Sequence, residues 1–249
     1  MTDWIRSIGC IFLFGWIISG CQQAPTVSVL PSPTLSIISL QYSPSLQYLL
    51  PLLHTCAMEE PRIALIVEER PTPNLDLSDT SLIFRLGAPD QIETYAAVLG
   101  QEKIAFIVHP SNPIRSLSQE QIRAIFSAKL TRWEQILPQS GFTGEIQVWS
   151  YPEEEDIQRI LQQSLEIDPI APSVFLAPNP TALRKIISTE PATFGFLPSR
   201  YLDSSVKNVE LDDETNLEPF PVLLIAPKQP QGLGKSFILC VQESLQPIQ

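Results

Sequence analysis

The sequence predicts an α/β protein in which short apolar strands alternate with amphipathic helices. Short apolar runs recur along residues 36–246, and helical spacing of apolar residues separates many of them. Serine and asparagine residues also stand where several helices are expected to begin. The length of this body suits one two-lobed domain or two small domains.

The first half of the body alternates between the two kinds of element. Its first helix is expected after Ser43, because the proline at the next position suits the first turn of a helix. The expected elements are a strand over 35–40, a helix over 44–53, a short buried strand over 63–67, and strands over 80–86 and 103–108.

The clearest helix start in the chain is Ser118. Gln121 follows three residues later and completes a capping box, in which each side chain satisfies a free backbone amide. Ile122, Ile125 and Phe126 then follow at helical spacing, which predicts that this face is buried. The remaining expected elements are a strand over 145–149, a helix over 152–165, a helix capped by Asn179 and Pro180, strands over 193–197, 206–211 and 222–225, and a helix over 234–245.

Residues 1–20 have the pattern of a lipoprotein signal peptide. Arg6 precedes an apolar run over 8–18 that is too short for a comfortable membrane span. The run ends Ile18-Ser19-Gly20-Cys21, with an aliphatic residue three positions before the cysteine and two small residues before the cut. We expect cleavage before Cys21, lipid on Cys21, and an extracytoplasmic protein held to the membrane by that lipid. The alternative is an uncleaved membrane anchor.

Residues 21–35 are expected to form a flexible tether, because they are rich in proline, serine and threonine and have no periodic apolar face. The formal net charge is −11. An acidic chain without a basic stripe is not expected to bind nucleic acid. Beyond Cys21, the mature chain has Cys56 and Cys240, which could form one bridge in an oxidising compartment; the spacing alone leaves this open.

Enzyme chemistry is not expected. His54 and His109 have no nucleophile motif near them, and no cofactor motif is present. Residues 153–156 are all acidic, which allows either a cation site or a solvated helix start that matches the helix dipole. We favour the helix start, because consecutive helical residues do not converge on one ion, and we expect no metal.

A set of short motifs lies in residues 103–136. An apolar strand is followed by Asn112-Pro113, Leu117-Ser118, Ile125-Phe126-Ser127-Ala128-Lys129 and Thr131-Arg132-Trp133. This order resembles the periplasmic phosphate-binding proteins, the solute receptors of phosphate ABC transporters, in which a glycine usually stands at the position of Ala128. The sequences of 193–197 and 218–222 are similar to later strands of that family, so the resemblance covers most of 36–246.

The resemblance implies a two-lobed type 2 periplasmic-binding-protein fold with mixed sheets and a two-crossing hinge. Lobe 1 would hold residues 36–109 plus 201–246, and lobe 2 would hold 110–198. A small-molecule solute would bind in the cleft between them, and an ABC permease is a possible partner.

Candidate binding residues come from loops that match the family. Ser43 and Ser45 lie in a turn similar to the family's Ser/Thr-rich turn after the first strand, although Ser43 could instead only cap the helix. Arg85 could face the cleft or form a surface ion pair. Tyr151 could serve as an aromatic wall for a larger, less charged solute.

The second-lobe loop departs from the family pattern. The family has Gly-Ser-Gly-Thr where this chain has residues 150–156, which contain no glycine, include Pro152 without an amide, and end in four carboxylates. One like charge about 4 Å from a phosphate costs on the order of 4 kcal/mol at an effective dielectric near 20, or about three decades of affinity. We therefore predict a membrane-anchored solute-binding lipoprotein whose ligand is uncertain. The alternative is an extracytoplasmic sensing or protein-interaction domain that has lost transport.

Overall fold

The computed structural model describes residues 34–88, 95–167, 169–212 and 217–245. The predicted signal peptide, Cys21 and most of the predicted tether lie outside the described residues. Residues 34–249 form one unit, and its elements are arranged around two mixed sheets, as the family resemblance implies. No helix in the described part of the chain is long and apolar enough to cross a membrane.

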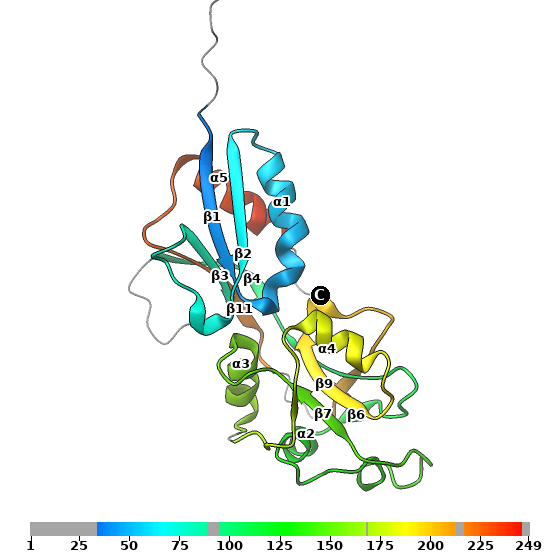
Figure 1. Cartoon of the computed structure of the whole chain (residues 1–249). Helices are drawn as coiled ribbons and strands as arrows, with labels where there is room; N and C mark the ends of the chain where they lie inside the picture. The colour runs from blue at the N-terminus through cyan, green and yellow to red at the C-terminus, as the bar shows by residue number, and fades with distance from the viewer. Residues whose placement is uncertain (1–33, 89–94, 168, 213–216, 246–249) are drawn as a thin grey trace, which may run out of the picture. The chain divides into compact units, whose positions relative to one another are not determined.

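The first sheet has the strand order β2-β1-β3-β11-β4 (Figure 1). Its strands are β1 (Ser36–Tyr42), β2 (Ile63–Glu69), β3 (Leu82–Leu86), β4 (Tyr95–Glu102) and β11 (Phe220–Ala226). β1 runs parallel to β2 and β3, whereas β11 runs antiparallel to β3 and β4. The last of the described strands therefore completes a sheet that the first of them began.

Two helices pack together beside this sheet. They are α1 (Leu50–Met58), which continues the 3₁₀ turn η1 (Pro44–Leu49), and α5 (Gly232–Ser244). Their buried residues include Leu53 on α1 and Phe237 and Val241 on α5. Cys56 and Cys240 join the two helices by a disulfide, with 5.8 Å between their Cα atoms. The structure thus forms the bridge that the spacing alone left open.

The second sheet has the strand order β6-β10-β5-β9-β7-β8. Its strands are β5 (Ile104–Val108), β6 (Ser116–Leu117), β7 (Gln147–Ser150), β8 (Phe175–Leu176), β9 (Thr193–Pro198) and β10 (Lys207–Leu211). β5 is antiparallel to both of its neighbours, and β7 is parallel to β8 and β9.

The helices of the second lobe confirm several predictions. They are α2 (Gln119–Phe126), α3 (Asp156–Leu165) and α4 (Pro180–Ile187). Ser118 and Gln121 form the capping box, and Phe126 is fully buried against the rings of Phe194 and Phe196. α4 lies so close to β9 that a Cβ at Gly195 would come within 2.9 Å of the nearest α4 side chain.

The predicted lobe boundaries need a correction, because β5 and β10 both belong to the second sheet. The chain leaves the first sheet at Glu102, enters the second at Ile104, and returns between Leu211 and Phe220. The second sheet therefore takes 104–108 and 207–211 from segments expected in lobe 1. The pairing of β5 with β9 fixes this assignment, because it joins five consecutive residues of each strand.

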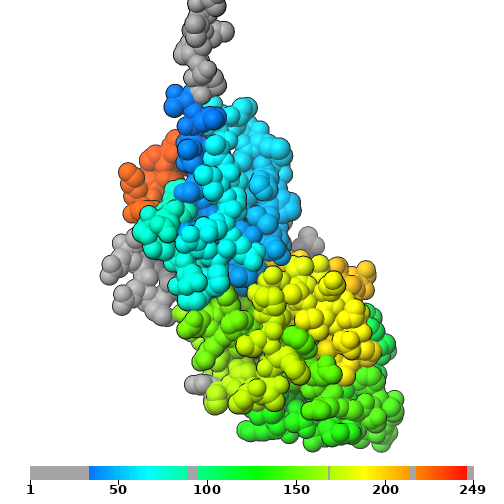
Figure 2. Space-filling model, viewed as in Figure 1, coloured from blue at the N-terminus to red at the C-terminus, as the bar shows by residue number. Residues whose placement is uncertain are grey.

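Two element predictions also need correction. β2 is an edge strand, and Ile66 is 58% exposed, so this strand is not buried as its apolar sequence suggested. Figure 2 shows β2, in cyan, on the visible face. The helix expected from Pro152 begins at Asp156 instead, because Pro152 starts a turn closed by the amide of Glu155.

Candidate functional site

The two lobes meet at a group of buried polar residues, called here the inter-lobe cluster. The first lobe contributes Ser45, Thr72 and the backbone of Leu86, and the second lobe contributes Glu155 and Asp156. η1 presents Ser45, the 3₁₀ turn η2 (Thr72–Asn74) presents Thr72, and β3 ends at Leu86. The second-lobe members are the cap and the first residue of α3.

Asp156 is the centre of the cluster and is 1% exposed. Its Oδ1 accepts hydrogen bonds from the Ser45 hydroxyl at 2.7 Å and from the Ile157 amide at 2.7 Å. Its Oδ2 accepts a bond from the Leu86 amide at 2.9 Å. The carboxylate also lies at the N-terminus of α3, where the helix dipole favours negative charge. Three donors and a dipole therefore compensate its burial.

Glu155 forms a second link between the lobes through Thr72. Its Oε2 accepts bonds from the Thr72 hydroxyl at 2.8 Å and the Thr72 amide at 3.2 Å. The Thr72 hydroxyl in turn accepts a bond from the Asp156 amide at 3.1 Å. The pKa of Glu155 is raised, chiefly by burial. The two hydrogen bonds from Thr72 lower this pKa, and the neighbouring charges of Asp156 and Glu69 raise it. The cluster is therefore acidic and largely enclosed.

The structure distinguishes the two serines predicted from the first-lobe turn. Ser45 bonds across to the other lobe. Ser43 is fully buried, its amide donates to the carbonyl of Phe84, and its hydroxyl has no hydrogen-bond partner among the described residues. Ser43 occupies the predicted N-cap position of η1, but its side chain makes no cap hydrogen bond.

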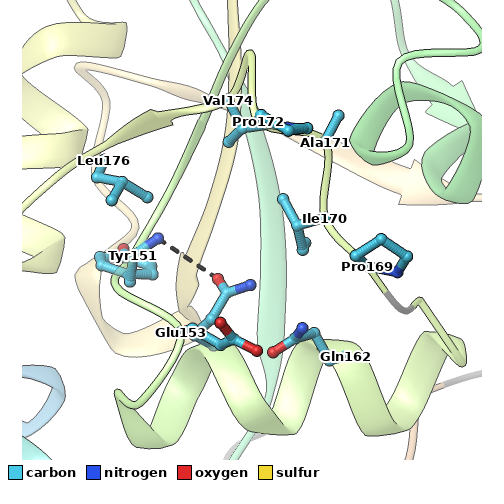
Figure 3. A pocket seen from close by; sticks show the side chains of 10 residues that line it. Tyr151, Glu153, Gln162, Pro169, Ile170, Ala171, Pro172, Val174 and Leu176 are labelled. Carbon is cyan, nitrogen blue, oxygen red and sulfur yellow. Dashed lines mark hydrogen bonds between the residues drawn. The ribbon is translucent and has the colours of Figure 1, made fainter.

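Tyr151 is not an aromatic wall of the inter-lobe cleft. It is 3% exposed, its ring packs edge-on to Phe196, and its hydroxyl donates to the Phe196 carbonyl at 2.9 Å. Tyr151 also lines a cavity of about 230 Å³ in the second lobe. In Figure 3, Glu153 and Gln162 lie on the α3 side of this cavity and Val174 lies across it.

Arg85 lies on β3 and is half-buried. Its Nε donates to the carbonyl of Leu86 at 3.4 Å, so it lies beside the backbone that holds Asp156. The remaining acidic residues of the predicted helix start, Glu153 and Glu154, are exposed in the turn before α3. No group of three or more potential metal ligands occurs among the described residues.

The hinge carries a second set of contacts. Glu102, at the first crossing, is fully buried and accepts bonds from the Ser199 hydroxyl at 2.6 Å and the Lys103 amide at 2.9 Å. Burial raises the pKa of Glu102. Tyr201 stacks edge-on to Tyr48, and the hydroxyl of Tyr201 accepts a bond from the Tyr48 amide at 3.3 Å. These contacts join the lobes beside the crossing.

Thr72 and the Leu86 amide could not be predicted from the sequence as members of the site. Thr72 lies between two prolines in a loop, which marks a turn and gives no sign of a partner 83 residues away. The Leu86 amide has no sequence signal, since any residue but proline supplies one. The acidic run itself was visible, but its pairing with these donors depends on how the lobes meet.

Comparisons with known proteins support the two-lobed assignment. Residues 93–212 match the PBP superfamily domain. No curated protein gives a significant match to the sequence.

Solved structures share the fold at low identity. A protein described as a phosphate ABC transporter substrate-binding protein from Clostridium perfringens, with bound phosphate, has a TM-score of 0.72 and 18% identity, over 83% of this chain and 93% of its own. An ABC-type phosphate transport receptor from Vibrio cholerae has a TM-score of 0.63 and 16% identity, over 84% and 94%. A variant regulatory domain of OxyR2 from Vibrio vulnificus has a TM-score of 0.62 and 14% identity, over 84% and 97%. The resemblance predicted from the sequence is thus confirmed, and the scaffold also serves a regulatory protein.

Proposed function

We propose that this chain, which carries a PBP superfamily domain and shares the fold of phosphate-binding proteins, is a lipid-anchored extracytoplasmic binding protein that does not bind free phosphate tightly. It is not an enzyme in this proposal. Its partners are a small solute less charged than phosphate and, for transport, an ABC permease.

One observation carries the proposal, namely the two buried carboxylates between the lobes. Glu155 and Asp156 are 6% and 1% exposed, and the inter-lobe donors Ser45, Thr72 and Leu86 bond to them. A phosphate entering this place would lose those donors and meet like charge. A hydrogen bond to a charged group is typically worth about 1.5–3 kcal/mol. Losing two or three of them therefore removes about 3–9 kcal/mol, a large part of the roughly 8 kcal/mol that binds a micromolar ligand, and repulsion by the two carboxylates adds to this loss.

The extracytoplasmic location is supported by two independent features. The sequence before Cys21 has the pattern of a lipoprotein signal peptide. The disulfide between Cys56 and Cys240 is typical of proteins that fold in an oxidising compartment. Neither feature suits a reduced cytosolic protein.

Isothermal titration of the full chain in detergent with inorganic phosphate at low salt tests the proposal. We expect no binding in the micromolar range. The control is a variant with Glu153→Gln and Glu154→Gln, which removes two exposed charges beside the site and leaves the inter-lobe cluster intact. The control should also fail to bind phosphate. Micromolar or tighter binding by the unmodified chain would overturn the proposal.

A second function, a protein-interaction or sensing domain without a small ligand, is favoured by the bonds that join the lobes directly. Thr181 on α4 donates to Gln47 on η1 at 2.7 Å, in addition to the bonds of the inter-lobe cluster. Native mass spectrometry of the chain extracted gently from membranes separates the two functions. A bound small molecule supports solute binding, and a ligand-free chain that retains a protein partner supports the interaction domain.

A further inference from the structure

The carboxylate of Asp156 lies in a site that has the composition of an oxyanion receptor. The Ser45 hydroxyl and the Leu86 amide approach it from the first lobe, and the Ile157 amide approaches it from the second. Hydroxyls and backbone amides at a helix N-terminus are the donors that proteins use for small anions. The site is therefore complete only when the two lobes are together.

The surroundings of this carboxylate also resemble those of a bound ligand. Asp156 is 1% exposed, so solvent does not compete for the three donors. Ser43, two residues before Ser45 in the same turn, is fully buried and its hydroxyl has no partner among the described residues. The first lobe thus keeps one hydroxyl that bonds to the carboxylate and one that is unused.

We propose that Asp156 is an internal ligand, which fills the oxyanion site of the cleft and holds the lobes together in the absence of any small molecule. The inference rests on the proposed function, because both require that free phosphate does not enter the cleft. It adds that the hydrogen-bond donors of the oxyanion site are all still present in this chain. Replacing Asp156 by alanine therefore creates a receptor for a small carboxylate such as formate, which matches the group removed, or acetate, which is one methyl group larger.

Thermal unfolding of the full chain in detergent tests this proposal with the variant Asp156→Ala. In sodium chloride the variant should unfold at a lower temperature than the unmodified chain. Sodium formate or acetate at the same ionic strength should restore the variant in a saturable way, by about 5–10 °C at one hundred times the dissociation constant. The unmodified chain should respond equally to formate and chloride.

Glu154→Ala is the matched control, because it removes an exposed carboxylate two residues away and leaves Asp156 in place. It should show no response specific to formate. An Asp156→Ala variant that responds no more to formate than this control would overturn the internal-ligand proposal. That failure is distinct from failure of the proposed function, which is tested by phosphate binding to the unmodified chain.

The proposal remains testable if Asp156→Ala does not fold in chloride. Refolding of the denatured variant should then recover folded protein in formate and not in chloride, measured by the far-ultraviolet circular dichroism signal. A variant that folds in neither salt would also overturn the proposal, since an intact site must accept an external carboxylate. Small-angle scattering adds a direct measure of closure: the variant should be more extended in chloride than in formate.

Discussion

At the scale of single residues, Ala128 is the clearest departure from the pattern of the family that the sequence resembles. It stands where that family usually has glycine, and its φ of 55° lies in the left-handed region. The amides of Lys129 and Leu130 both bond to the carbonyl of Ala124, which holds the chain in this turn after α2. The Cβ of an alanine is strained in this conformation, whereas a glycine is not.

Ala128→Gly should stabilise the protein. Relief of the left-handed strain outweighs the added freedom of the unfolded chain, so we expect the free energy of unfolding to rise by about 0.5–1 kcal/mol. Urea unfolding measures the change. Ala124→Gly is the matched control, because the same substitution inside α2 should cost about 1 kcal/mol. A loss of stability at position 128 as large as the loss at 124 would contradict the account.

Only part of the site could be predicted from the sequence. The turn that holds Ser45 and the acidic run that holds Asp156 are both visible in the sequence, but the hydrogen bond between these residues spans 111 positions. No local sequence pattern predicts a contact between two residues so far apart in the chain. Tyr151 was misplaced for a related reason: its strand end suggested the cleft, but the carbonyl of Phe196 offers its hydroxyl a partner inside the lobe.

At the scale of elements, most helices and strands could be predicted because their signals are local. The capping box at Ser118 and the asparagine cap at Asn179 both occur in the structure. β4, β6 and β8 were missed: β6 and β8 have two residues each, and β4 combines apolar residues with Gly100 and Gln101. Such strands are fixed by the partner beside them rather than by their own composition.

The disulfide between α1 and α5 gives a prediction at this scale. It joins cysteines 184 residues apart, so it restricts the unfolded chain strongly. Reduction should lower the free energy of unfolding by about 2–5 kcal/mol. A variant with Cys56→Ser and Cys240→Ser should have this lower stability at once and show no further response to reductant. Equal unfolding midpoints with and without reductant in the unmodified chain would show that the bridge does not form.

At the scale of the whole molecule, the two-lobed fold followed from the family resemblance rather than from periodicity. Alternating elements predict an α/β class, and many folds share that class. The crossings were placed incorrectly, because β5 and β10 could have joined either sheet by composition alone. Only the order of strands in each sheet decides this, and that order depends on pairs far apart in the chain.

The membrane anchor is the prediction that concerns the whole chain. Mass spectrometry of protein extracted from membranes should find residue Cys21 as the N-terminus, carrying diacylglycerol. Cys21→Ser should leave an unprocessed, unlipidated precursor. A water-soluble mature protein that begins at another residue would rule out lipidation.

The position of β11 has a consequence for the order in which the lobes can form. β11 lies between β3 and β4, yet it is the last of the described strands along the chain, and Cys240 follows it. The described strands of the second sheet all lie between Ile104 and Leu211, so that sheet can form while the C-terminal residues are still being synthesised or exported. The first sheet cannot be completed until residue 226 has been synthesised or exported, because β3 and β4 are joined only through β11. Because such distant pairing is slow, a chain stalled before β11 would present one finished lobe and one open sheet edge to chaperones and proteases.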